Sequence, residues 1–186
     1  MKRNQKVNGK DWAQRKAAEY ATAEEFCKIF TTDLKQLYLL SLMLAGTHRD
    51  AEQSFTSAFV ECQKQKSVFK PWARSWSRLA VIESAIKLVN PTAGLSEEAV
   101  IADDGGEAAD GLSQELARVT RLDAFHRFVF VLVVLEGYSV RDCAILLKRG
   151  KREIESAKLR AISILAAQDG SIFKPAANVF AASLSA

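Results

Sequence analysis

The chain has 186 residues, of which 48% are hydrophobic and 26% charged, with a net charge of +4. This composition is typical of a soluble globular protein and excludes wholesale disorder. The longest apolar run, 128–135, is too short to cross a bilayer, and the basic N-terminus lacks the apolar core of a secretory signal. We therefore expect a cytoplasmic protein without membrane insertion.

Apolar residues recur at helical spacing, and no stretch shows a sustained two-residue period, which predicts an all-α fold. A basic arm, 1–21, comes first. A helix is predicted after Thr22, because Thr22 and Glu25 have the spacing of a capping box. Leucines continue the helical spacing as far as Leu44, where the sequence GTHRD interrupts it.

Two further helices are predicted in this first half. One begins near Asp50 and carries Phe55, Phe59 and Cys62 on one side. The other covers about 72–89 and follows a break that contains Pro71 near the first helical position. Its predicted apolar positions are Trp72, Trp76, Leu79, Ala80 and Ile86.

An acidic linker separates this half from a second helical unit. Residues 88–117 contain no Lys or Arg, whereas basic residues are concentrated on either side. The flanks could contact a nucleic acid, which would repel the acidic middle. Helical pieces are predicted at 113–118, 122–135, 140–147 and 151–167. The predicted organisation is an arm (1–21), a helical module (22–90), a linker (91–112), a second module (113–168) and a tail (169–186).

The stretch 137–165 reads as two short helices with a basic turn. Ser139 is a good N-cap, and Gly150 is expected to supply a positive φ in the turn. The second helix places Ile154, Ala157, Ala161 and Leu165 on one face and basic residues on the others. This pattern fits a helix-turn-helix whose second helix enters the major groove. It also fits a helical hairpin with a solvated charged face, and the stretch alone leaves both open.

Longer motifs resemble a known family. The segment LDAFHRFVFVLVVLEGYSVRDCAILL, followed by KREIESAKLRAISIL, is similar to the C-terminal module of sigma factors, which direct bacterial RNA polymerase to promoters. The N-terminal half resembles the matching module of the small extracytoplasmic-function sigma factors, through its DAE motif, 50–52, and its F-x-x-W spacing from Phe69 to Trp72. The resemblance covers about 33–89 and 118–166.

The resemblance implies three contact regions. The upstream promoter element would be bound by Lys148, Arg149, Lys151, Arg152, Glu155, Ser156, Lys158 and Arg160. The melted strand would be held by Trp72, Arg74, Trp76, Arg78 and Lys87, since single strands are bound by aromatic and basic groups. Core RNA polymerase would be bound by Asp50, Glu52, Gln53 and Phe59. Burial in the core is the commoner role of tryptophan and is the competing expectation for both tryptophans.

The chain also departs from the family pattern. Gln53 stands where the family usually has an acidic residue, and the family usually has a Gln near the position of Ser57. Leu79 replaces a polar Asn. The helix end at 86–87 is less basic than usual. In the second module the departures are Lys148 for the turn Gly, Arg149 for an apolar residue, Glu155 for a basic or polar residue, and Ala157 for an Arg. Gly150 could take over the turn, and Glu155 could accept a hydrogen bond from a cytosine amino group.

The leading hypothesis is a promoter-recognition subunit with core RNA polymerase and promoter DNA as partners; the sequence does not identify an anti-sigma factor. A second hypothesis is a sigma-like adaptor that binds polymerase or a regulator without initiating transcription. A third is a stand-alone helix-turn-helix regulator that binds a two-fold-symmetric site as a dimer.

We expect no catalytic activity, cofactor, metal or small-molecule substrate. The histidines are His48 and His126, and no hydrolytic triad, metal-ligand spacing or phosphate loop is present. His126 is interpreted as a partly buried structural residue. Cys27, Cys62 and Cys143 are far apart and are interpreted as apolar residues of helices.

Overall fold

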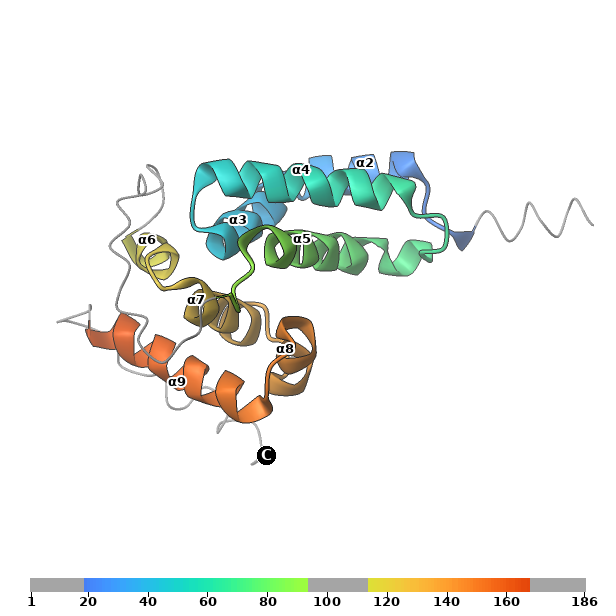
Figure 1. The fold of residues 1–186 in the computed structure, drawn as a ribbon. Coiled ribbons are helices and arrows are strands. Elements are labelled where there is room, and N and C mark those ends of the chain that lie inside the picture. Colours follow the sequence, from blue (N-terminus) through green and yellow to red (C-terminus); the bar gives the residue numbers. More distant parts are fainter. Residues whose placement is uncertain (1–18, 94–113, 168–186) are drawn as a thin grey trace, which may run out of the picture.

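The computed structural model describes residues 19–93 and 114–167 (Figure 1). The fold of these residues is all-α, as predicted, and includes an isolated antiparallel bridge between Tyr20 and Phe69. The N-terminal half (19–93) contains α2 (Ala23–Thr32), α3 (Leu34–Ala45), α4 (His48–Lys64), a 3₁₀ turn (Lys70–Trp72) and α5 (Ala73–Val89). The C-terminal half (114–167) contains α6 (Gln114–Thr120), α7 (Ala124–Phe130), the π-helical segment η2 (Val131–Leu135), α8 (Val140–Leu147) and α9 (Lys151–Ala167). Most of the predicted acidic linker, the N-terminal arm and the tail lie outside the described residues.

The capping box predicted at Thr22 is present. The backbone N–H of Glu25 donates to Thr22 Oγ1 at 3.2 Å, and the N–H of Thr22 donates to the Glu25 carboxylate at 2.8 Å. The helical spacing that follows belongs to two helices rather than one, because Asp33 leaves helical geometry with φ −100° and ψ 18°. Its carboxylate instead pairs with Arg74 of α5 at 2.8 Å.

Helix α4 begins at His48, slightly earlier than predicted, since Thr47 Oγ1 accepts a hydrogen bond from the N–H of Asp50. The apolar face predicted for α5 is only partly correct, because Ala80 and Ile86 pack against the core whereas Trp72 and Trp76 are exposed. Its buried residues are Ala73, Ser77, Val81, Ile82, Ser84 and Ala85. The small side chains in this set let α5 lie close beside α4 (Figure 1). Trp76 of α5 and Trp72 of the preceding 3₁₀ turn are left on the solvent side.

Helices α8 and α9 have the predicted boundaries, but the turn between them does not have the predicted geometry. Lys148, not Gly150, adopts the left-handed conformation, with φ 53° and ψ 44°. The expectation that Gly150 supplies a positive φ is therefore wrong. Lys148 therefore places a Cβ in the left-handed region, which glycine adopts without strain.

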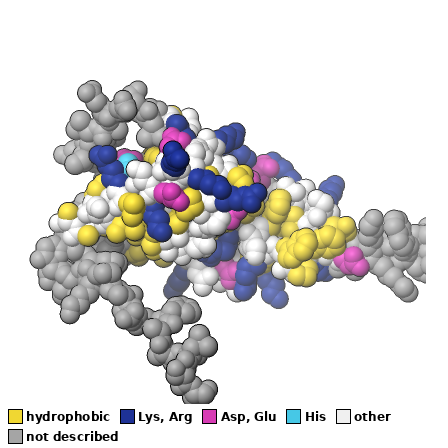
Figure 2. Space-filling model, turned by 90° about the horizontal axis from the view of Figure 1, so that it is seen from below, with side chains coloured by type: hydrophobic (Ala, Val, Ile, Leu, Met, Phe, Trp, Pro, Cys, Tyr) yellow, Lys and Arg dark blue, Asp and Glu magenta, His cyan; other side chains and the backbone are white. Residues whose placement is uncertain are grey.

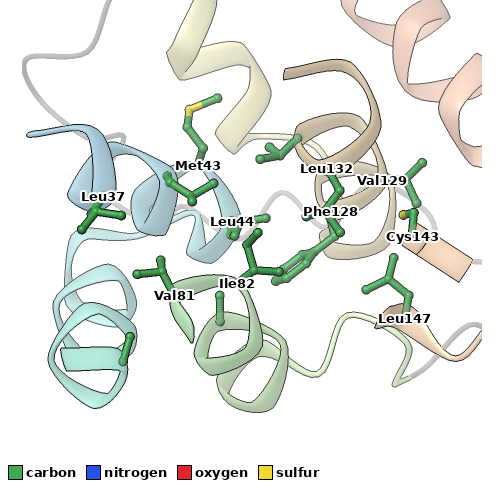
Figure 3. Close-up of a cluster of buried hydrophobic side chains, with 14 of the residues drawn as sticks. Leu37, Met43, Leu44, Val81, Ile82, Phe128, Val129, Leu132, Cys143 and Leu147 are labelled. Carbon is green, nitrogen blue, oxygen red and sulfur yellow. The ribbon is translucent and has the colours of Figure 1, made fainter. Parts of the chain in front are cut away.

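The two halves share one core. Buried side chains of α3 and α5 belong to the same cluster as those of α7, η2 and α8, and the Phe128 ring points toward Ile82 (Figure 3). Leu44 and Leu132 lie in the same cluster. The two predicted modules are thus packed against each other across this core.

A buried arginine reinforces the junction. Arg127 of α7 is 8% exposed and donates to the carbonyls of Leu44 (3.0 Å), Ala45 (3.1 Å), Thr120 (3.1 Å) and Leu122 (2.8 Å). The first two carbonyls end α3, where a helix has no internal partners and favours a positive charge. Burial lowers the pKa of Arg127, and nearby Asp123 and Asp50 act in the opposite direction.

Candidate nucleic-acid and polymerase interface

The outer face of α9 is the first candidate surface. Ile154, Ala157 and Ala161 are buried, which orients α9 on the core. Ala157 is therefore packed against the core, and the larger side chain of an Arg would not fit at this position. The opposite side is formed by the exposed residues Lys151, Arg152, Glu155, Ser156, Leu159 and Arg160. We refer to these six residues as the outer face of α9.

The face of the molecule that carries α9 is mixed in charge, with acidic and hydrophobic side chains among the basic ones (Figure 2). Arg149 is only half exposed, because it donates to the carbonyl of Thr92 at 3.0 Å and pairs with Glu153 at 3.5 Å. Within the described residues, Lys151 and Arg160 make no ion pair. These two cations are thus available to bind phosphates, whereas Arg149 already has partners.

The tryptophans of the predicted melting helix are exposed. Trp72 is 65% exposed and Trp76 is 39% exposed, so the expectation of core burial is wrong for both. The core side of α5 is taken by Val81, Ile82 and its small residues. The Trp72 ring contacts Phe69 edge-on, with centroids 5.4 Å apart, and Phe69 stacks on Tyr20 at 4.7 Å. Trp72 thus extends from an aromatic cluster that holds one side of its ring.

The basic residues of this helix have different environments. Arg74 pairs with Asp33 at 2.8 Å. Arg78 donates from two nitrogens to the carboxylate of Glu136, at 2.6 and 3.1 Å, across the junction between the halves. Lys87 is exposed and lines a hollow of about 180 Å³ that Trp76 also lines. Of the three cations, Lys87 alone lacks an ion pair among the described residues.

The four predicted polymerase-binding residues lie on α4. Glu52 and Gln53 are exposed, and Asp50 is half buried. Phe59 is also half buried and packs on Phe30, with ring centroids 5.1 Å apart. Glu52 and Gln53 can therefore reach a partner directly, whereas Phe59 also supports the core.

The titratable groups His126, Asp123, Cys62 and Cys143 contribute to capping and packing of the helices. His126 is half buried, as expected, and hydrogen-bonds to the carboxylate of Asp123, the N-cap of α7. Burial alone would raise the pKa of Asp123, but hydrogen bonds from the His126 side chain and backbone outweigh it and lower the pKa. Burial raises the pKa of Cys62 to about 11 and that of Cys143 to about 12. These thiols are therefore protonated and unreactive near neutral pH.

The described segments contain no cluster of three or more His, Cys, Asp or Glu side chains suited to a metal ion. Nor does any helix within these segments have the length and apolar character needed to cross a bilayer. A hollow of about 260 Å³ lies at the junction of the halves, between α3, α5, α6 and η2. Leu39, Met43 and Leu135 line it, and the Arg78–Glu136 pair lies at its edge.

Three notable residues were missed by the sequence interpretation. Tyr20 was assigned to the arm, yet it stacks on Phe69. Arg127 was treated only as the boundary of an apolar run, and nothing local marks it as buried. Leu159 is 66% exposed on the outer face of α9. Leu159 follows Ser156 by three residues and Glu155 by four, and this spacing could have placed it on the same face of the helix as these polar residues.

Comparison with known proteins shows similarity to a bacterial sigma factor. The chain is 25% identical over 148 residues to the ECF RNA polymerase sigma factor SigM of Mycobacterium tuberculosis, covering 76% of this chain and 75% of that protein. The same values hold for SigM of two strains, Erdman and H37Rv. No family model matches the chain, and no solved structure matches it. The chain is thus distantly similar to an extracytoplasmic-function sigma factor.

Proposed function

We propose that this protein is an RNA polymerase sigma factor of the extracytoplasmic-function type, which binds core polymerase and directs promoter-specific initiation. The observation that carries the proposal is the length of the similarity to SigM, 148 residues. A match of that length is too long to fit within either half alone. It therefore supports a shared two-part organisation rather than a common helical hairpin.

In this proposal the outer face of α9 binds the upstream promoter element. Lys151 and Arg160 would neutralise phosphates and position the helix, while Arg152, Glu155 and Ser156 would face base edges. Lys158, half buried on α9, and Lys148 and Arg149 of the turn would add phosphate contacts at the border. For Arg149 this requires an exchange of its present partners, Glu153 and the Thr92 carbonyl.

The exposed tryptophans at the start of α5, Trp72 and Trp76, fit the binding of melted DNA. A base can stack on the free side of Trp72, and Trp76 lies one helical turn further along the same side. Lys87 would bind a phosphate near Trp76. Arg74 and Arg78 would join only after leaving Asp33 and Glu136. We infer that DNA binding by Arg74 and Arg78 competes with these internal pairs.

Core polymerase would be bound through α4, by Glu52 and Gln53 with Asp50 and Phe59 beside them. Glu52→Lys reverses an exposed charge on this helix and is expected to weaken binding at least fivefold. Glu24→Lys on α2, also exposed, is the matched control and should leave binding unchanged. Both variants can be measured by pull-down of purified bacterial core polymerase.

Promoter-directed transcription from the reconstituted complex tests the whole proposal. Initiation from specific sites is expected, and Arg160→Ala or Lys151→Ala should reduce it. Lys28→Ala, which removes the same charge from α2 at the opposite end of the molecule from α9, is the control (Figure 1). Failure to bind core polymerase would contradict the proposal.

A second candidate, the sigma-like adaptor, is favoured by the internal engagement of Arg74, Arg78 and Arg149 and by the carboxylate of Glu155. An adaptor would bind core polymerase and yet give no specific initiation. It would also lack the salt-sensitive DNA binding that neutralised phosphates produce. The transcription assay and a salt titration of DNA binding separate the two candidates.

A further inference from the structure

The most exposed large hydrophobic side chain of the described residues lies in the middle of the outer face of α9. Leu159 is 66% exposed. It follows Ser156 by three residues, Glu155 by four and Arg152 by seven, so the four side chains form one row along the helix. Ile154 and Ala161, on the other side, are buried.

A single exposed leucine is ordinary on a protein surface, so its position decides its meaning. This row points away from the core and is bordered by Lys151 and Arg160, which make no ion pair with any residue that the structure describes. If the cations hold phosphates on either side of a groove, the row between them faces the base edges. An apolar side chain there meets one apolar group in the major groove, the 5-methyl of thymine.

Glu155 gives the row a second preference. A carboxylate accepts hydrogen bonds but cannot donate them, and the donor that carboxylates select in the major groove is the amino group of cytosine. The two positions are one helical turn apart, about 6 Å along the axis. Bases stack about 3.4 Å apart on a strand, so the two contacts would lie about two base steps apart.

We propose that Leu159 is a specificity-determining residue of α9 that contacts a thymine methyl group, with Glu155 selecting a nearby cytosine. The inference rests on the proposed promoter-binding function and deepens it. It assigns the upstream element a thymine and a cytosine about two steps apart, the thymine being required for its methyl group.

The test uses the full chain bound to core polymerase. Sites are first selected from a randomised duplex library, and a thymine is expected in the part read by α9. Each selected thymine is then replaced by deoxyuridine, which removes only the methyl group. One replacement should weaken binding by the intact protein about threefold to fivefold, the value of one buried methyl group.

Leu159→Ala should bind the thymine and deoxyuridine sites almost equally, because the partner of the methyl group is gone. Ile145→Ala is the matched control: Ile145 is 65% exposed but lies on α8, outside this row, and should keep the full methyl effect. Glu155→Gln should relax the preference for cytosine and keep the methyl effect.

A methyl effect that is absent in the intact protein, or unchanged in Leu159→Ala, would overturn the assignment while leaving promoter recognition intact. If the complex selects no sequence at all, the proposed function fails together with it. Leu159 is exposed, so its removal is not expected to unfold the chain, and circular dichroism checks this directly.

Discussion

Replacing Arg127 with Met tests how the two halves are held together. The substitution keeps a long apolar stem but removes a guanidinium that donates to four buried carbonyls, those of Leu44, Ala45, Thr120 and Leu122. Two of these end α3 in the N-terminal half, one ends α6, and one lies between α6 and α7. The change therefore removes hydrogen bonds that join the halves, while it preserves most of the packing.

The expected magnitude follows from opposing effects. Hydrogen bonds from a charged donor contribute roughly 1.5–3 kcal/mol each, so four would suggest a loss of more than 6 kcal/mol. Burial of the guanidinium costs several kcal/mol, which the variant recovers. Water can also reach some of the carbonyls once the head group is gone. We expect the free energy of unfolding to fall by about 3 kcal/mol.

Urea denaturation followed by circular dichroism measures the loss. Arg121→Met, at an exposed position nearby, is the matched control and should change stability by less than about 0.5 kcal/mol. Arg127→Lys should fall between Met and the unchanged protein, since one ammonium group keeps the charge but cannot span four carbonyls. If Arg127→Met lies within about 1 kcal/mol of the unchanged protein, the carbonyl contacts do not hold the halves together.

Three further predictions concern single sites. Lys148→Gly should raise the free energy of unfolding by about 1 kcal/mol, because glycine adopts φ 53° without strain; a lower urea midpoint would contradict this. A thiol reagent at pH 8 should label the folded chain at the exposed cysteine alone, because burial raises the pKa of Cys62 to about 11 and of Cys143 to about 12; rapid labelling of all three would refute this burial. Asp123→Asn keeps an N-cap but loses the charge beside His126, and should cost about 0.5 kcal/mol at neutral pH, since the pair is partly exposed. The pKa of Asp123 in the folded protein lies below its usual value of 3.8, so the stability difference between the unchanged protein and Asp123→Asn is fully present above pH 3.8. It should vanish as the pH falls through the folded pKa. Urea denaturation at several pH values measures this difference, and a difference that does not change with pH would show that the charge has no role.

The helix boundaries that could be predicted are those set by local interactions. The capping box of Thr22 and the N-cap at Ser139 involve residues only three apart, so the sequence pattern contains the whole interaction. The apolar period of α9 likewise predicts its buried face, and hence its basic outer face. The all-α class follows from the same three- and four-residue spacing.

The candidate site was predictable in part for the same reason. The outer face of α9 was expected from periodicity, whereas the exposure of Trp72 and Trp76 was implied by the family resemblance alone and not by the residues of α5. Hydrophobicity favours burying a tryptophan, but α5 packs on the core through Val81 and Ile82. The small side chains on the same face, such as Ala73 and Ala85, permit close approach to α4. The choice between these faces depends on the neighbouring helix and is invisible in α5 itself.

What the sequence by itself determined is therefore the local order of the chain: its helical class, its caps and the charged face of its last helix. The tertiary structure alone decided the packing of the halves, the burial of Arg127 and the pairing of Arg78 with Glu136, two residues 58 positions apart. It also decided that Lys148 takes the left-handed turn. Capping hydrogen bonds and apolar periodicity involve residues only a few positions apart, so they can be predicted from the sequence. Contacts between distant residues depend on which surfaces meet, and that is settled only when the helices pack.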